Sequence, residues 1–198
     1  MANVNARFID VILTLQVANS YNQQIGRIQL QKYIYLSDTI SLIWDVIATK
    51  YGHETYKHGP FDEAINNAID ALAFRGFVDI ASIKMEEKRV DALYVINKSG
   101  SKLFNELYDN DYFKNKISLY QTVGSHVDRI GWRKLKDLVY AEPTYLHSRA
   151  NGYGFKFDYL SLFSNDSLRI LYQFENMLKD GQKISKENMV SMFFKLIE

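Results

Sequence analysis

Tyr56-Lys-His-Gly-Pro-Phe61 opens the stretch of sequence that decides the fold, and the stretch ends at Tyr94-Val-Ile-Asn-Lys-Ser-Gly-Ser-Lys-Leu-Phe104. Gly59 and Pro60 are predicted to be the N-cap and the first residue of a helix. Proline has no N–H to leave unpaired at that position, and its φ is already helical. Tyr56, Gly59 and Pro60 are therefore structural markers of a helix start.

The residues that follow repeat first with helical and then with strand-like spacing. The apolar positions at helical spacing are Ile65, Ala68, Ile69 and Leu72, and Gly76 is placed to end the helix. Two β-rich runs, residues 77–83 and 90–96, flank a charged turn and predict a hairpin. A helix, a hairpin and a further helix in this order are typical of a winged helix, a fold that serves DNA binding and protein docking alike.

The composition allows a sizeable core and narrows the class of protein. The chain has 198 residues, of which 47% are hydrophobic and 14% aromatic, which suits one domain or two small ones. It has no cysteine, so disulfides, thiolate catalysis and cysteine zinc sites are excluded. The N-terminus lacks a signal-peptide pattern, and no run approaches the roughly 18 apolar residues of a membrane span. We therefore expect a cytoplasmic protein without a membrane partner.

The remaining sequence predicts a mainly α-helical protein. Apolar spacing indicates a first helix from Val4 to Leu15 that ends near Ser20, and a long second helix from Gly26 to Ile47. Further helical patterns fill the C-terminal half, and Ser185 is the predicted N-cap of the last helix. We predict a winged-helix-like domain with a small β-hairpin at residues 1–108. A helical region at residues 109–198 is expected to pack on it as one compact unit.

Catalytic patterns with the required spacing are missing from the sequence. It contains no phosphate loop of the Gly-x-x-x-x-Gly-Lys type, no Gly-x-Ser-x-Gly motif and no His-Glu-x-x-His helix. Asp79 followed by Glu86 and Lys88 has the order of a magnesium nuclease, but a hairpin turn would direct the last two side chains into solvent. The histidines are expected to be surface or core groups. We predict no enzyme activity, no cofactor and no metal site.

Positive charge is concentrated in one segment. The formal net charge is only +1, so contact with nucleic acid would depend on a local patch. The predicted helix at residues 62–75 carries more acidic than basic residues, and phosphates beside a DNA groove would repel it. The candidate phosphate contacts are Arg129, Arg133, Lys134 and Lys136, on a predicted helix whose opposite face holds Trp132, Leu135 and Leu138. The alternative is an ordinary solvated helix face.

Aromatic residues suggest a second surface. The chain has 14 Tyr and 12 Phe, and tyrosine offers a large rigid contact with a polar tip. Pro143 and the glycines of Asn151-Gly-Tyr-Gly154 are expected to break the helical pattern and present side chains from a loop. The candidate partner-binding residues are Tyr140, Tyr145, Tyr153, Phe155 and Phe157. The alternative is that these residues cover the core.

Three motifs together resemble a known pattern. They are Leu30-Gln-Lys-Tyr-Ile-Tyr-Leu-Ser-Asp38, Tyr56-Lys-His-Gly-Pro-Phe-Asp62, and the helix that ends at Arg75-Gly-Phe77 before the hairpin. This pattern is similar to that of Panacea-type antitoxin domains and of the middle components of three-component ABC-ATPase systems. The later string Leu138-Val-Tyr-Ala-Glu-Pro-Thr-Tyr-Leu-His-Ser-Arg-Ala-Asn-Gly152 resembles the second group more closely.

The resemblance implies a non-catalytic adaptor. In Lamassu-type anti-phage systems, a small accessory subunit of this kind accompanies an SMC-like ATPase and an effector. The expected function is therefore that of an accessory subunit in a bacterial defence complex, with a sequence-independent DNA contact as a further possibility. The alternative is an antitoxin that neutralises a toxin and binds operator DNA, and a metal-dependent nuclease is a third, more distant option.

Overall fold

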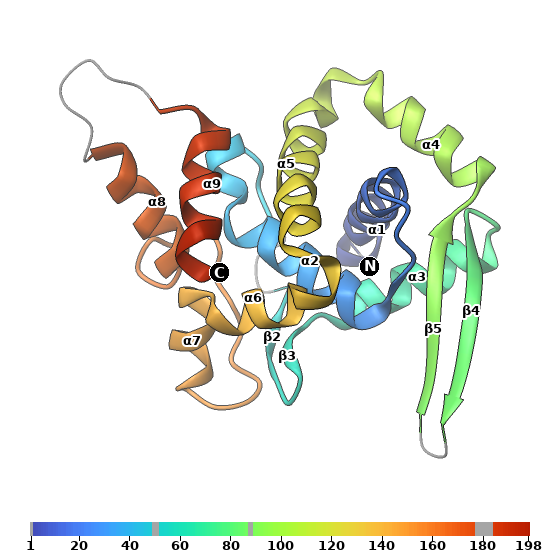
Figure 1. Ribbon diagram of the computed structural model, residues 1–198, viewed down its shortest axis with the longest axis horizontal. Coiled ribbons are helices and arrows are strands. Elements are labelled where there is room, and N and C mark those ends of the chain that lie inside the picture. Colours follow the sequence, from blue (N-terminus) through green and yellow to red (C-terminus); the bar gives the residue numbers. More distant parts are fainter. Residues whose placement is uncertain (1, 49–51, 87–88, 177–183) are drawn as a thin grey trace.

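The computed structural model describes residues 2–48, 52–86, 89–176 and 184–198, and these form a mainly α-helical protein with a small antiparallel sheet (Figure 1). The elements of the N-terminal half are α1 (Ala2–Ser20), β1 (Ile25–Gly26), α2 (Arg27–Thr39), η1 (Ser41–Trp44), β2 (Glu54–Tyr56), β3 (Gly59–Phe61), α3 (Glu63–Phe74), β4 (Val78–Glu86), β5 (Arg89–Ile96) and α4 (Lys98–Tyr108). Those that follow are η2 (Asp111–Phe113), α5 (Lys114–Ile130), η3 (Trp132–Lys134), α6 (Leu135–Ala141), α7 (Pro143–Arg149), α8 (Asp166–Asn176) and α9 (Lys186–Ile197).

The predicted hairpin is present as β4 and β5, which project from the helical body (Figure 1). The sheet has the strand order β1-β5-β4, and β1 pairs only with Leu93 and Tyr94. The outer part of β5 therefore lies beyond the end of β1. The pairing of β4 with β5 shifts by one residue between Ile80 and Ser82, so Ala81 is a bulge residue.

The helix predicted after Gly59 and Pro60 begins later than the sequence suggested, and this prediction is corrected. Gly59 and Pro60 lie in β3, which pairs with β2 through the register Tyr56↔Gly59. Gly59 has a φ of +95°, so it closes a tight hairpin instead of capping a helix. Asp62 is the N-cap of α3, and its Oδ1 accepts a hydrogen bond from the Ala64 N–H at 2.9 Å.

Helix ends elsewhere follow the predicted signals in part. Gly76 has a φ of +74° just after α3, and Ser185 caps α9 by accepting from the Asn188 N–H, as predicted. The prediction of a long second helix is wrong, because α2 ends at Thr39 and a 3₁₀ turn follows. Asp45 then adopts a left-handed conformation with φ of +56°, and Ile47 is exposed instead of continuing the apolar stripe.

Pro143 begins a helix. It occupies the first turn of α7, and the buried Glu142 side chain caps that helix by accepting from the N–H groups of Thr144 and Tyr145. The same carboxylate accepts a hydrogen bond from the Tyr35 hydroxyl at 2.6 Å. Glu142 thus joins the start of α7 to α2.

A buried charged cluster connects the N-terminal helices. Arg7 of α1 is fully buried and forms ion pairs with Asp10, Asp38 of α2 and Asp62, each at 2.7 or 2.8 Å. Lys116 of α5 also pairs with Asp10. Because buried charges are costly unless they are paired, this arrangement fixes the relative positions of α1, α2, α3 and α5.

Candidate nucleic-acid interface

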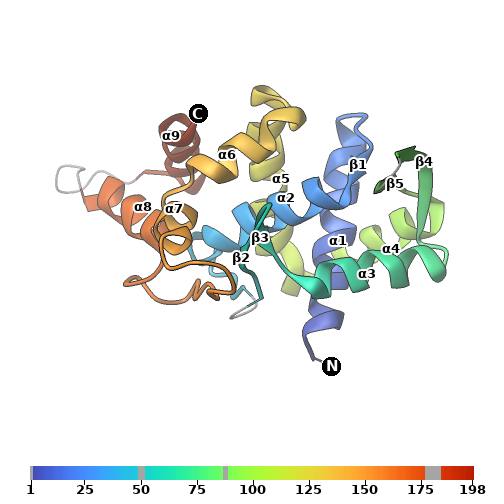
Figure 2. The same cartoon turned by 90° about the horizontal axis from the view of Figure 1, so that it is seen from below.

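A groove of about 760 Å³ runs between the β4–β5 hairpin and α6. Its floor is the first turn of α2, which lies between the hairpin and α6 (Figure 2). The hairpin and α6 supply the side walls, and the residues that line it include Gly26, Arg27, Gln29, Lys32, Lys84, Asp91, Leu93, Tyr94, Trp132, Arg133, Leu135 and Lys136. We call this feature the wing groove.

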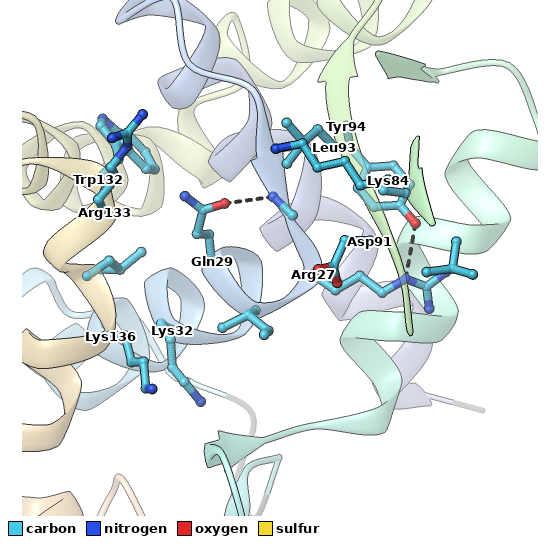
Figure 3. A pocket seen from close by; sticks show the side chains of 15 residues that line it. Arg27, Gln29, Lys32, Lys84, Asp91, Leu93, Tyr94, Trp132, Arg133 and Lys136 are labelled. Atoms are coloured by element: carbon cyan, nitrogen blue, oxygen red, sulfur yellow. Dashed lines mark hydrogen bonds between the residues drawn. The ribbon is translucent and has the colours of Figure 1, made fainter. Parts of the chain in front are cut away.

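The wall formed by η3 and α6 is fixed by its apolar residues. Trp132 is buried and stacks on Tyr33 of α2, with ring centroids 5.5 Å apart and planes 4° from parallel. Leu135 is also buried. These anchors leave Arg133 and Lys136 on the exposed side, where both line the groove (Figure 3).

The opposite wall combines Arg27 of α2 with the hairpin. The Arg27 Nε donates a hydrogen bond to the Tyr94 hydroxyl at 3.0 Å (Figure 3). Its guanidinium also pairs with Asp70 of α3. Lys84 of β4 lies in register with Asp91 of β5. The floor begins at Gly26, whose N–H donates to the Gln29 side chain at 2.8 Å and so fixes the start of α2.

The lining is strongly cationic. Among the described lining residues, the basic ones are Arg27, Lys32, Lys84, Arg133 and Lys136, and the only acidic one is Asp91. Low-dielectric walls lined by one sign of charge concentrate counter-ions. The wing groove is therefore suited to a polyanion, although the net charge of the chain is only +1.

Lys32 is the least exposed of these cations. Only 3% of its surface is accessible, and its Nζ donates a hydrogen bond to the Pro60 carbonyl at 2.9 Å. Burial, together with the nearby charge of Lys136, lowers the pKa of Lys32 to about 7.

The four predicted phosphate contacts are only partly brought together. Arg133 and Lys136 line the wing groove, whereas Arg129 and Lys134 are exposed outside it. The expectation of a single helix carrying all four is wrong, because α5 ends at Ile130 and Gly131 turns the chain with a φ of +108°. Arg129 instead lies in the last turn of α5, with a guanidinium nitrogen 3.3 Å from the His126 ring.

Three lining cations were missed in the sequence because they come from other elements. Arg27 and Lys32 lie on α2, and Lys84 lies on β4, more than 45 positions before Arg133. A sequence signal existed only for Arg27, which follows a glycine at a predicted helix start. The convergence of these residues depends on how α2, α6 and the hairpin pack.

The aromatic candidates divide between surface and core. Tyr153 and Phe155 are exposed, and Tyr140 is half-buried. Tyr145 and Phe157 are buried, so the expectation that they form an exposed interface is corrected. The Phe157 ring packs edge-on against Tyr35 at 5.1 Å, and its N–H donates to the His53 carbonyl, which holds this part of the loop against the core.

The nuclease alternative gains no support. Asp79 accepts a hydrogen bond from the Asn97 side chain at 2.9 Å. Lys88 and the Glu86 side chain lie outside the described residues. Within the described parts of the chain, no group of three or more histidine and carboxylate side chains is arranged to hold a metal ion.

In the described parts of the chain, no helix is both long enough and apolar enough to cross a membrane. Comparison with known proteins finds no matching family model and no similar curated protein.

Proposed function

We propose that the chain is a non-catalytic adaptor that contacts nucleic-acid phosphates in the wing groove, independently of base sequence. The observation that supports this proposal is the excess of cations among the described residues of the groove: besides Arg27, which is paired with Asp70, four basic residues line it against Asp91. Contacts of lysine and arginine with phosphates release counter-ions and supply most of the affinity of non-specific binding. Arg133, Lys136 and Lys84 are the residues expected to make them.

The acidic helix α3 does not compete with this surface. Asp62 is buried and paired with Arg7, and Asp70 is paired with Arg27. Two of its carboxylates are therefore already neutralised within the chain. A winged-helix-like arrangement in which the hairpin side, not α3, faces the nucleic acid is consistent with these contacts.

We further propose that the adaptor works as the accessory subunit of a bacterial anti-phage complex in the cytoplasm, with an SMC-like ATPase and an effector as partners. The resemblance of the Leu30–Asp38, Tyr56–Asp62 and Leu138–Gly152 motifs supports this proposal. The exposed Tyr153 and Phe155 offer a second surface, separate from the wing groove, on which a protein partner can dock.

DNA affinity measured across a salt series tests the nucleic-acid contact. The triple variant Lys84→Ala, Arg133→Ala, Lys136→Ala should flatten the dependence of log affinity on log salt by about two to three units. A charge-matched control is Lys102→Ala, Lys156→Ala, Lys195→Ala, because these lysines are exposed and none lines the groove. An unchanged slope in the first variant removes the wing groove from the DNA site. Strong dependence on one base sequence would instead favour an operator-binding antitoxin.

Protein partners are tested by co-purification. Docking at the loop that carries Tyr153 and Phe155 is supported if the double variant Tyr153→Ala, Phe155→Ala loses an associated ATPase or effector. Retention of the partner by this double variant excludes that surface. Incubation of the purified chain with DNA, RNA or nucleotides in magnesium should leave all of them intact, and cleavage would contradict the adaptor proposal.

A further inference from the structure

The outer strand of the hairpin, β4, ends the sheet with an unpaired edge. The strand order is β1-β5-β4, and among the described residues no strand pairs with the other side of β4 (Figure 1). Its exposed side chains include large apolar ones, since Ile80 is 50% exposed, Ile83 57% and Met85 81%. An open edge of this kind presents unpaired N–H and C=O groups and is a template for a further strand.

The bulge at Ala81 decides which apolar side chains of β4 share a face. Before the bulge, Ile80 is opposite Tyr94 of β5, and after it Ile83 is opposite Ala92. Tyr94 and Ala92 lie on the same face of β5 because side chains alternate along a strand. Ile80 and Ile83 therefore share that face.

The other face of β4 carries one charge of each sign. Asp79 is opposite Val95 and Lys84 is opposite Asp91, and these two positions of β5 lie on the same face. Both Asp79 and Lys84 are exposed. Asp79 Oδ1 accepts a hydrogen bond from the Asn97 side chain at 2.9 Å, and a carboxylate has a second oxygen for a further contact.

The strand is chemically symmetric about Ser82. Counted outward from Ser82, with the extra Ala81 left out, the residues at equal distances on the two sides are Ile80 and Ile83, Asp79 and Lys84, and Val78 and Met85. Two antiparallel copies of β4 related by a two-fold axis at Ser82 would bring these residues opposite each other. Each pair would then occur twice, with the apolar pairs on one face and the charged pairs on the other.

Neighbouring registers lack this complementarity. A two-fold axis at Ile80 would place Asp79 opposite Ser82, and an axis at Ile83 would place Lys84 opposite Ser82. Only the axis at Ser82, of these three, brings Asp79 and Lys84 together. Unlike charges directly opposite each other stabilise a strand pair, so this register is favoured.

We propose that the chain forms a symmetric dimer through β4, which joins two three-stranded sheets into one sheet of six strands. The occupant of the open edge is a second copy of the chain, because the charges and the apolar side chains of β4 complement those of β4 itself. The turn before β4 leaves room for the tip of the second hairpin, since a Cβ atom added at Gly76 would meet no atom within 4 Å. This inference goes beyond the proposed function and does not rest on it.

Sedimentation velocity of the wild-type chain, without nucleic acid, tests the dimer. A single edge pairing buries less than the interface of about 1,200 to 2,000 Å² that is standard for stable complexes, so the dimer should be weak. Between about 1 and about 100 μM, the measured mass should rise from that of one chain toward that of two. A mass of one chain throughout overturns the inference. Because no nucleic acid is present, this failure would leave the wing-groove proposal unaffected.

Two charge variants test the register. In a homodimer, Asp79→Lys places a lysine opposite Lys84, and Lys84→Glu places a glutamate opposite Asp79. Each variant alone should therefore dimerise at least about tenfold more weakly than wild type. Lys102→Glu, on the exposed side of α4, makes the same charge change as Lys84→Glu and should dimerise as wild type does.

An equal mixture of the two charge variants restores unlike charges in both pairs. Heterodimers should then form about as strongly as the wild-type dimer, which a general loss of folding in either variant could not produce. A mixture that dimerises no better than the separate variants overturns the register.

A single introduced thiol gives a second readout, because the chain has no cysteine. Ser82 meets its own counterpart at the axis, where paired Cα atoms lie about 4.5 to 5.5 Å apart, a separation that a disulfide spans. Ser82→Cys should therefore form a cross-linked dimer under mild oxidation. Met85→Cys is the matched control, since Met85 is more exposed but would lie about 20 Å from its counterpart. At equal fractions of dimer, a Ser82→Cys chain that cross-links no faster than Met85→Cys overturns the inference.

Discussion

Arg7 Nε and Asp62 Oδ2 lie 2.8 Å apart although 55 positions separate them in the sequence. Asp62 also caps α3, so one carboxylate joins the start of α3 to the middle of α1. The same guanidinium reaches Asp10 and Asp38. Burial raises the pKa of Asp38 to about 7 even beside Arg7.

Replacement of Arg7 by methionine should destabilise the fold by about 3 to 5 kcal/mol, because it leaves buried carboxylates without their partner. Without Arg7, the raised pKa values of Asp38 and Asp62 rise further, and the lowered pKa of Asp10 rises toward its ordinary value. A raised carboxyl pKa contributes stability at low pH that is lost as pH rises, so the loss should be larger at pH 8 than at pH 5. Urea unfolding at both pH values checks this. Lys186→Met, which breaks the exposed pair with Asp45, is the control and should cost under about 1 kcal/mol.

Lys32→Met should be more stable than wild type at pH 6, since it removes a charge that the folded chain buries at a cost. The folded pKa of about 7 lies below the unfolded value, so wild type gains stability as pH rises through this window. The advantage of the variant should therefore shrink by at most about 1.4 kcal/mol per pH unit between pH 7 and pH 9. Thermal or urea unfolding of both proteins measures it. A difference that does not vary with pH would show that Lys32 titrates normally.

Gly124→Ala should destabilise the contact between α1 and α5. The added Cβ would stand 2.2 Å from a Val17 methyl carbon and 3.0 Å from the Tyr33 hydroxyl. Overpacking of this kind typically costs about 1 to 3 kcal/mol, which exceeds the gain in helix propensity of about 1 kcal/mol. Ser125→Ala, on the exposed side of the same helix, provides the comparison in a denaturant titration. Equal stability of the two variants would mean that the helices move apart without cost.

The aromatic loop allows core and surface roles to be separated. Phe157→Ala should cost about 3 to 5 kcal/mol because Phe157 is buried against Tyr35. Tyr153→Ala should change stability by less than about 0.5 kcal/mol, since Tyr153 is 75% exposed. The midpoints of urea unfolding compare them. A large loss in Tyr153→Ala would assign that side chain to folding and remove it as a candidate interface residue.

The sequence predicted the helices and the hairpin where local signals agree with the packing. The apolar spacing of α3, the glycine after it and the β-rich runs of β4 and β5 are all local features. The prediction of a helix start at Gly59 and Pro60 was wrong because proline suits an extended strand as well as a helix start. Only the pairing of β2 with β3 decides between the two. The α2 prediction failed because apolar residues after Thr39 are buried from a 3₁₀ turn as readily as from a helix.

The site was less predictable than the fold. Arg133 and Lys136 were found because they lie within four positions of each other in a basic segment. No local sequence pattern identifies Lys32 and Lys84 as site residues, since an isolated lysine in a sequence resembles any surface lysine. Their place in the wing groove follows from tertiary packing, in which Trp132 stacks on Tyr33 and so holds α6 beside α2.

The bulge at Ala81 changes which face of the hairpin each following residue of β4 occupies. Side chains alternate between the two faces of a strand, so one extra residue exchanges the faces for everything beyond it. Val78 and Ile80 pair with Ile96 and Tyr94, but after the bulge the even-numbered Ser82 and Lys84 pair with Leu93 and Asp91. Before the bulge, the even-numbered residues of β4 therefore share a face with the even-numbered residues of β5. After the bulge they share a face with the odd-numbered residues of β5, among them Asp91. Deleting Ala81 would restore a single phase and exchange the faces on which Lys84 and the apolar Ile83 and Met85 are presented.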